Sequence, residues 1–352
     1  MVEATNFKND LNECVSVAST ASLSTWNSEC SDYDAVGELL GLNLDFNALY
    51  NFQRQLGQGS YGTVWAASLV SDPKQVYAVK VIDRNNQKKR EEAVFREVEL
   101  LQELQDLRHV VPVIDFMVEP QSIYVVQQYA RGGDLARRLA EKKFFTEQEV
   151  RSIAVTLFET LDVMHTKHAI VHRDLKPENM LLSDAMTDQV LLADFGLAKK
   201  VPKEGLKTKC GTPAFVAPEI ILGKRYHQPI DMWSIGCILF MMIGGSPPFQ
   251  IEGVKDIGAY FQKIRSGNFS FHQDRWKFVS VHCKRLIARL LIVSPTARYT
   301  ARMALESDWI KGAGRKTLKR GVATAEPAWD NNFNGPFQSA MQVVRVAVSA
   351  IA

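Results

Sequence analysis

Two carboxylates, one carboxamide and one lysine lie close together near the middle of the chain. The stretch 172–179 reads His-Arg-Asp-Leu-Lys-Pro-Glu-Asn, and fifteen residues after Asn179 comes Asp194, followed by Phe and Gly. Asp174 could accept a proton from an attacking hydroxyl, while Asn179 and Asp194 offer hard oxygen atoms to a small divalent cation. Mg²⁺ takes few protein carboxylates and relies on phosphate oxygens. These residues therefore predict phosphoryl transfer.

Three short apolar runs surround these polar residues. They span 169–171, 180–182 and 190–193, and each is short enough to be a buried strand. Polar loops carried on such strands are where a rigid scaffold usually places catalytic groups. We therefore predict that short strands hold Asp174, Asn179 and Asp194 in place.

A glycine-rich stretch, 56–64, reads Leu-Gly-Gln-Gly-Ser-Tyr-Gly-Thr-Val. Glycine lets backbone amides approach phosphate oxygens because it has no Cβ. Dinucleotide-binding folds use the same spacing, but there a helix should follow. Here residues 63–67 read as a strand, which favours a β-hairpin lid over nucleotide phosphates.

The central motifs closely resemble the catalytic and metal-binding loops of eukaryotic protein kinases, in order and at the same spacing. The resemblance covers roughly residues 50–310. It implies an α+β, bilobal fold, with a small antiparallel β-sheet and one helix at about 50–128 and a mainly helical lobe at about 129–310. ATP and Mg²⁺ would be bound between the lobes.

The resemblance also implies roles for individual residues. Asp174 would orient and deprotonate the substrate hydroxyl, and Lys176 would neutralise the moving phosphate. Asn179 and Asp194 would hold two Mg²⁺ ions.

On the nucleotide side, Lys80 would grip the α- and β-phosphates and would be fixed by Glu97. Spacing alone does not exclude Glu99 as its partner. The nucleotide would contact Leu56, Gly57, Gly59, Gly62, Val64, Ala78, Lys80, Gln128, Ala130, Asp134 and Leu181.

Residues 194–219 match the kinase activation segment. Within it, Thr212 would bond Asp174 and Lys176, a pattern typical of Ser/Thr kinases. Thr208 matches a position that carries an activating phosphate in several such kinases, and Arg173 and Lys199 would cluster around that phosphate. An unmodified, exposed threonine is the alternative.

Several motifs look most like the calcium/calmodulin-dependent kinase group. These are residues 132–135, 181–193 and 246–249. Glu178 and Asp134 would attract a basic residue upstream of the target, which predicts a basophilic kinase. By the same resemblance Arg298 would ion-pair with Glu219.

The bulk properties favour an intracellular protein, cytoplasmic or nuclear, and the kinase resemblance implies that it acts on protein substrates. A net charge of +3 predicts neither a nucleic-acid nor a membrane partner. Five scattered cysteines indicate reduced thiols, and the longest apolar run, 235–243, is too short to span a bilayer. Activation by an upstream kinase and autophosphorylation both remain open, as does the oligomeric state.

Segments outside the resemblance are expected to be different in kind. Residues 1–49 predict a largely disordered leader, in which Phe46 could instead dock on the domain or join a short helix. Residues 311–352 form a tail with a basic cluster. A pseudokinase scaffold and a small-molecule phosphotransferase are the other functional classes, and intact Lys80 and Asp174 argue against the first.

Overall fold

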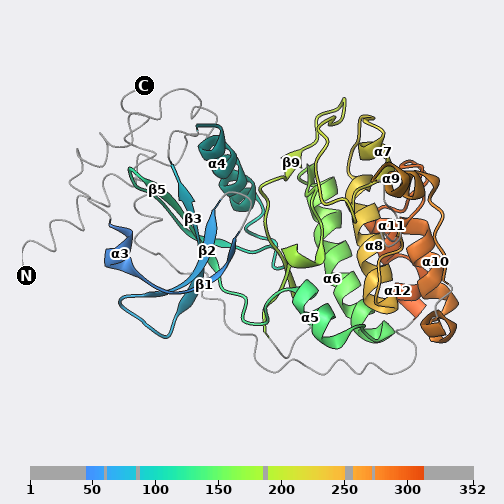
Figure 1. Cartoon of the computed structure of the whole chain (residues 1–352), viewed down its shortest axis with the longest axis horizontal. Helices are drawn as coiled ribbons and strands as arrows, with labels where there is room; N and C mark the ends of the chain where they lie inside the picture. The colour runs from blue at the N-terminus through green and yellow to red at the C-terminus, as the bar shows by residue number, and fades with distance from the viewer. Residues whose placement is uncertain are drawn as a thin grey trace, which may run out of the picture. The chain divides into compact units, whose positions relative to one another are not determined.

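The computed structural model describes residues 45–58, 62–84, 88–184, 189–249, 257–271 and 274–312. Within these ranges the chain divides into two compact units, one holding residues 45–91 and 113–128 and the other residues 92–112 and 129–312 (Figure 1). Apart from residues 45–49, 311 and 312, the predicted leader and tail lie outside the described residues.

The first unit contains an antiparallel five-stranded sheet in the order β1-β2-β3-β5-β4. Strands rich in Val, Tyr, Trp and Ile suit a half-buried pleated surface. The strands are β1 (Tyr50–Gln58), β2 (Thr63–Leu69), β3 (Val76–Asp83), β4 (Val113–Val118) and β5 (Ser122–Gln128).

An aromatic cluster closes one side of this sheet. The short helix α3 (Phe46–Leu49) buries Phe46, whose ring stacks on Tyr50 at 4.8 Å and on Tyr124 at 4.1 Å between centroids. The backbone amide of Phe46 also donates to the Glu119 carboxylate at 2.7 Å. Phe46 therefore docks on the sheet and also begins a short helix, so both of the alternatives to disorder that its sequence allowed are met.

A buried carboxyl lies beside this cluster. Tyr50 Oη donates to Asp115 Oδ2 at 2.9 Å, and the Phe116 amide donates to Asp115 Oδ1 at 2.8 Å. Burial raises the pKa of Asp115 to about 6, although both hydrogen bonds lower it.

Helix α4 (Lys88–Glu103) leads from the first unit into the second. The amphipathic pattern of residues 88–107 predicts a helix that runs to Leu107. After Glu103, however, the chain tightens into turns, with the Leu107 amide donating to Leu104 O at 2.9 Å. Four residues later the Val111 amide donates to Leu192 O, also at 2.9 Å, so the helix must end for the chain to reach β8.

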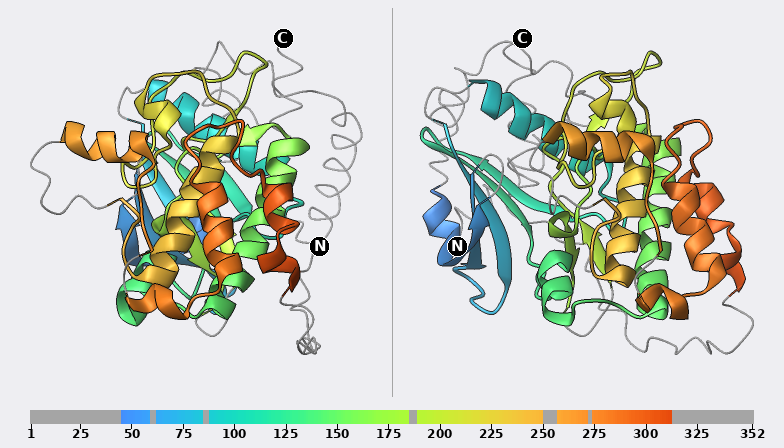
Figure 2. Two further views of the ribbon diagram at one scale, coloured as in Figure 1. Left: turned by 90° about the vertical axis from the view of Figure 1, so that its right-hand side faces the viewer. Right: turned by 45° about the vertical axis from the view of Figure 1, so that its right-hand side comes forward.

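The second unit is mainly helical. Helix α8 is apolar on all sides and almost wholly buried, with α6 and α10 packed against it and α11 packed against α6 (Figures 1 and 2). The helices are α5 (Leu135–Lys142), α6 (Glu147–Thr166), α7 (Pro218–Ile221), α8 (Pro229–Gly244), α9 (Ile257–Ser266), α10 (Val281–Leu290), α11 (Ala301–Leu305) and α12 (Asp308–Gly312), with 3₁₀ turns η2 (Pro177–Asn179) and η3 (Asp274–Phe278).

Local signals explain two helix boundaries. Thr146 and Glu149 have the sequence spacing of a capping box and form one at the start of α6. The sequence of residues 301–310 predicts a single closing helix, but the structure has two short helices there. The chain turns at Ser307, whose Oγ accepts from the Ile310 amide at 3.5 Å. Ser307 acts as a second helix start within that stretch.

Two small antiparallel pairs in the second unit support the polar loops. They are β6 (Ile170–Val171) with β9 (Lys199–Lys200), and β7 (Met180–Leu182) with β8 (Val190–Leu192). The predicted α+β class, with one antiparallel sheet followed by a mainly helical part, is confirmed. Among the described helices, none combines the length and apolar character needed to cross a bilayer.

Candidate active site

The loop that carries Asp174 begins directly after β6 and is fixed by a residue from a distant helix. The backbone amides of His172 and Arg173 donate to the Asp231 carboxylate of α8 at 2.9 and 3.0 Å. Arg173 has a φ of +69°, an uncommon conformation for a non-glycine residue. The two bonds to Asp231 hold the backbone in this shape.

The Asp231 carboxylate is buried and makes a third hydrogen bond. His165 Nε2 lies 2.9 Å from Asp231 Oδ2. Burial alone would raise the pKa of Asp231, but the bonds from His165 and the His172 amide outweigh it and leave the pKa below its usual value. Asp231 is therefore an ionised carboxylate that braces the catalytic loop from inside the helical unit.

His172 links this loop to the loop that carries Asp194. Its Nε2 lies 3.0 Å from Ala193 O, and its ring packs on Phe195 with centroids 4.8 Å apart. The Ala193 amide in turn donates to Asn179 O at 3.0 Å. The two polar loops are thus held as one structure.

Asp174 receives hydrogen bonds on both carboxylate oxygens. The amide and the hydroxyl of Thr212 donate to Oδ1 at 2.9 and 2.7 Å. Lys176 Nζ donates to Oδ2 at 2.7 Å, and Asn179 Nδ2 makes a long contact to the same oxygen at 3.4 Å. The structure brings together four of the predicted site residues, Asp174, Lys176, Asn179 and Thr212.

The environment of Asp174 keeps it ionised. Burial raises its pKa, but hydrogen bonds from Lys176 and Thr212 and the Lys176 charge outweigh that effect, so the pKa of Asp174 lies below its usual value. An ionised carboxylate can accept a hydrogen bond from an alcohol and orient it.

Asn179 and Asp194 have the chemistry of a partial magnesium site. Asn179 Nδ2 donates to Asp174 O at 2.9 Å, which leaves Asn179 Oδ1 as an acceptor. Asp194 is half-buried at a φ of +58°, and no hydrogen bond or ion pair to its carboxylate is found within the described residues. In the part of the chain that the structure describes, no group of three or more His, Cys, Asp or Glu side chains is placed so that it could hold a metal ion. Two hard oxygens suit a cation that completes its shell with phosphate and water.

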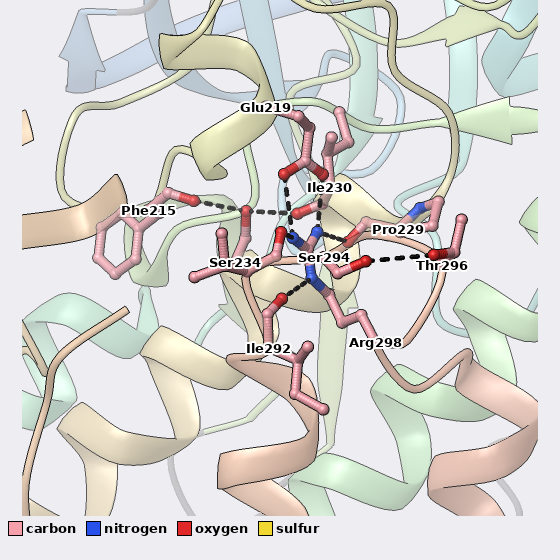
Figure 3. A network of polar contacts seen from close by, with 10 residues as sticks. Phe215, Glu219, Pro229, Ile230, Ser234, Ile292, Ser294, Thr296 and Arg298 are labelled. Atoms are coloured by element: carbon pink, nitrogen blue, oxygen red, sulfur yellow. Dashed lines mark hydrogen bonds and ion pairs between the residues drawn. The ribbon is translucent and has the colours of Figure 1, made fainter. Parts of the chain in front are cut away.

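The segment after Thr212 is fixed to the helical core by two contacts (Figure 3). Ser234 Oγ of α8 donates to Phe215 O at 2.8 Å. Glu219 and Arg298 form a bidentate pair at 2.8 and 3.0 Å, as the sequence suggested. Arg298 also donates to the carbonyls of three further residues, Pro229, Ile292 and Val293.

Gly211 is required where the segment crosses the catalytic loop. Its φ is +102°, and a Cβ there would lie 2.8 Å from Arg173 O. An L-residue at this position would strain the backbone and push the segment away from the loop.

Arg173 and Lys199 differ in their relation to Thr208. Arg173 donates through Nε to Leu197 O and through Nη1 to Tyr226 Oη, and Tyr226 Oη donates to Thr208 O. Arg173 therefore reaches Thr208 through one intervening hydroxyl. Lys199 is exposed on β9, and no contact between it and Thr208 occurs within the described residues.

In the first unit, strand register places predicted nucleotide contacts side by side. Gly57 of β1 pairs with Val64 of β2, and Val64 pairs with Lys80 of β3. A Cβ on Gly62 would lie 2.0 Å from Val81 O, so only glycine fits there. Of the remaining predicted contacts, Leu56 lies on β1, Ala78 on β3 and Gln128 at the end of β5, while Gly59 falls outside the described residues.

In the second unit, three predicted contacts surround the start of α5. Asp134 forms a bridge with Leu181 of β7, and its side chain caps α5 by accepting from the Arg137 amide at 2.7 Å. Ala130 is buried just before this turn. The structure thus brings Ala130, Asp134 and Leu181 into one region.

Burial favours Glu97 over Glu99 as the functional glutamate of α4. Glu97 is 5 % exposed, whereas Glu99 is half-exposed. Burial nevertheless raises the pKa of Glu99. Lys80 is 7 % exposed on β3.

Sequence reasoning missed three contributors: His165, Ser234 and Tyr226. Each contacts a residue that is distant along the chain: His165 contacts Asp231, Ser234 contacts Phe215 and Tyr226 contacts Arg173. Ser234 is marked locally only as a polar side chain inside the apolar helix α8, and His165 and Tyr226 carry no local signal.

Comparison with known proteins agrees with this geometry. Residues 50–310 match the family described as protein kinase domain. Calcium/calmodulin-dependent protein kinase type 1 of Caenorhabditis elegans is 35 % identical over 271 residues, which cover 77 % of this chain and 76 % of that protein. The calcium/calmodulin-dependent protein kinase cmkA of Emericella nidulans is 37 % identical over 293 residues, covering 78 % and 69 %. A probable myosin light chain kinase of Dictyostelium discoideum is 37 % identical over 267 residues, covering 74 % and 83 %.

Proposed function

Because the chain belongs to the protein kinase family and is a protein serine/threonine kinase, we propose that it transfers the γ-phosphoryl group of ATP to serine and threonine hydroxyls of protein substrates through Asp174. The predicted likeness to calcium/calmodulin-dependent kinases is confirmed by the relatives above. The observation that carries the proposal is the Asp174 carboxylate, fixed by Thr212 and Lys176 and kept ionised.

Asp174 would orient the attacking hydroxyl and accept its proton. Its Oδ1 already takes two hydrogen bonds from Thr212, and its Oδ2 takes one short bond from Lys176. The contact from Asn179 to Oδ2 is long, at 3.4 Å. Oδ2 is therefore the oxygen with room for a substrate hydroxyl.

Lys176 and the two hard-oxygen residues would manage the charge of the phosphates. Lys176 Nζ lies beside Asp174 and could neutralise the moving phosphoryl group. Asn179 and Asp194 would hold Mg²⁺, which supplies charge neutralisation at the phosphate oxygens when bound.

The nucleotide side of the proposal assigns Lys80, supported by Glu97, to the α- and β-phosphates. Its support is the burial of both side chains and the register that sets Lys80 beside Val64. The remaining nucleotide contacts are proposed as predicted: Leu56, Gly57, Gly59, Gly62, Val64, Ala78, Gln128, Ala130, Asp134 and Leu181.

A basic residue upstream of the target is the proposed substrate preference. Glu178 is exposed at the catalytic loop, and no ion pair to its carboxylate is found within the described residues. The Asp134 carboxylate accepts a hydrogen bond from the Arg137 amide, and a carboxylate bonded in this way can still attract a basic side chain. A peptide pair differing only in Arg or Ala upstream of the target tests this preference, and equal rates for the two would contradict it.

Phosphorylation of Thr208 is the proposed activating event. The Thr208 side chain is exposed between exposed Lys207 and Lys209, and Arg173 approaches its backbone through Tyr226. A phosphate would add about −2 charge among these cations. Mass spectrometry of the purified chain, with and without ATP, measures Thr208 occupancy; an activity that does not change with occupancy would refute this regulation.

The main test replaces Asp174 with Asn. Loss of the proton acceptor should lower the rate of radiolabelled phosphate transfer by roughly 10²–10⁴-fold. The matched control is Asp274→Asn, because Asp274 is exposed and paired only with Lys277 within the described residues. Wild-type protein that transfers no phosphate, or an Asp174→Asn variant as active as the control, would sink the proposal.

A further inference from the structure

The hydroxyl of Tyr226 lies between the catalytic loop and the activation segment. Arg173 Nη1 donates to it at 3.2 Å, and the hydroxyl donates to Thr208 O at 2.7 Å. The Tyr226 side chain is almost fully buried, at 2 % exposure. One phenol therefore satisfies a guanidinium on one side and a backbone carbonyl on the other.

Backbone contacts place this phenol accurately. The Leu206 amide donates to Tyr226 O, and the Tyr226 amide donates to Leu206 O, both at 2.9 Å. Arg225 Nη1 donates to Gly205 O at 3.2 Å. Gly205 has a φ of +78° and lies against His227, the residue after Tyr226. A Cβ on Gly205 would lie 2.5 Å from the His227 ring.

The charge of the segment makes a neutral acceptor for Arg173 useful at this point. Residues 203–209 contain three lysines and one glutamate, so the segment that Arg173 reaches through Tyr226 is net positive while Thr208 carries no phosphate. The Tyr226 oxygen accepts a hydrogen bond from Arg173, and the Tyr226 O–H donates a hydrogen bond to Thr208 O. Burial raises the pKa of Tyr226, so the phenol keeps that proton at neutral pH.

The short stretch from Thr208 to Thr212 is connected to the catalytic loop by hydrogen bonds at both ends. At one end Thr208 reaches Arg173 through Tyr226, and at the other Thr212 bonds Asp174, the next residue. Gly211 lies against Arg173 O in between. Movement at Thr208 is therefore transmitted to Thr212 over four residues.

The geometry points to Tyr226 as a positioning residue that holds the activation segment on Arg173 while Thr208 is unphosphorylated, so that basal activity depends on its hydroxyl. This inference rests on the phosphotransfer proposed above. Arg173 and Thr208 were singled out by sequence, whereas Tyr226 carries no signature of its own.

The experiment compares Tyr226→Phe with Tyr260→Phe, both in a Thr208→Ala background that excludes phosphorylation. Tyr260 is a matched control because it is fully buried in α9 and its hydroxyl has no hydrogen-bond partner among the described residues. Two quantities are measured: amide hydrogen exchange over residues 205–208, and the steady-state kinetics of peptide phosphorylation.

We expect Tyr226→Phe to speed exchange of these amides roughly tenfold, since a hydrogen bond to a charged group is lost. The KM for peptide should rise by a similar factor while the KM for ATP stays unchanged. Variants that merely lose stability would lower the active fraction without moving the peptide KM. Tyr260→Phe should change neither quantity, and equal behaviour of the two variants would overturn the inference.

A double-variant cycle tests whether Tyr226 acts through Arg173. In an Arg173→Met background, Tyr226→Phe should add less further exchange than it does in the parent chain, because the bond from Arg173 is already lost and only the bond to Thr208 O remains to be removed; fully additive effects would refute the coupling. If Tyr226→Phe does not fold, Arg173→Met alone tests the bond from its other side, and unchanged exchange at 205–208 would overturn the inference. A wild-type chain that transfers no phosphate would instead reject the proposed function. In that case amide exchange at residues 205–208 would still show whether Tyr226 holds the activation segment on Arg173.

Discussion

Replacing Glu219 with Gln should destabilise the second unit severely. The Glu219–Arg298 pair is shielded from water, with side-chain exposures of 4 % and 0 %, and the five N–H donors of Arg298 make five hydrogen bonds. Glutamine keeps the size of glutamate but leaves the guanidinium charge uncompensated in a low-dielectric site. Breaking a buried pair in this way costs about 3–5 kcal/mol.

The matched control is Glu141→Gln, the same chemical change at the surface. Glu141 pairs with Arg137 at 3.0 Å, but the two side chains are 57 % and 74 % exposed. Exposed pairs one helical turn apart contribute about 0.3–0.5 kcal/mol. The two substitutions therefore separate the effect of burial from that of charge removal.

Urea and thermal unfolding measure the difference. Arg298 lies 5.1 Å from the Trp233 ring centroid, so tryptophan fluorescence reports this site, and circular dichroism reports the helices. At roughly 2–4 °C per kcal/mol for a domain of this size, Glu219→Gln should lower the melting temperature by roughly 6–20 °C. If the two Glu→Gln variants unfold within about 0.5 kcal/mol of each other, the reasoning from burial is wrong.

Three further substitutions test other features. Asp115→Asn removes a carboxyl whose folded pKa is about 6; the contribution of Asp115 to wild-type stability should be fully present below about pH 4 and fall by about 3 kcal/mol as pH rises through 6, and the variant should lose that part of the slope in pH-dependent urea unfolding. Gly211→Ala places a Cβ against Arg173 O, so melting should show a loss of about 1–3 kcal/mol and peptide phosphorylation should slow. Thr146→Ala removes half of the capping box with Glu149 and should cost about 1 kcal/mol in urea unfolding.

Each of these has an outcome that contradicts it. An Asp115→Asn chain with the wild-type pH slope would show that other groups set that slope. Gly312→Ala is the control for Gly211→Ala, since a Cβ there meets nothing within 4 Å, and equal losses would contradict the crowding argument. Thr146→Ser should retain the cap, so a loss as large as that of Thr146→Ala would count against hydrogen bonding as the cause.

The parts of the fold that sequence predicted well are those with local causes. The capping box at Thr146 is a pattern over four residues, and the strand–loop–strand around Asp174 follows from short apolar runs. The Arg298–Glu219 pair was available only through resemblance, because 79 residues separate the two. Local physics sets the elements, and the family pattern supplied their long-range partners.

The contacts that sequence did not predict depend on loop geometry. Glu103, at the end of α4, accepts from His168 Nδ1 at 3.1 Å and lies 2.7 Å from Lys200 Nζ. Nothing in the neighbouring residues marks these three as partners, because they meet only after α4, α6 and β9 are arranged. The contacts of Tyr226 also depend on the folded loops, because its hydroxyl lies between Arg173 and Thr208 only once those loops are in place.

The dependence of the catalytic loop on Asp231 has a consequence for synthesis of the chain. The amides that set the loop's shape lie 58 and 59 residues upstream of the carboxylate that receives them. A nascent chain whose α8 segment is still inside the ribosome already contains every residue from His172 to Thr212. It lacks the Asp231 carboxylate in place to accept the amides of His172 and Arg173. Enzymatic competence should thus appear late in translation, at the step when α8 docks, rather than growing gradually with chain length.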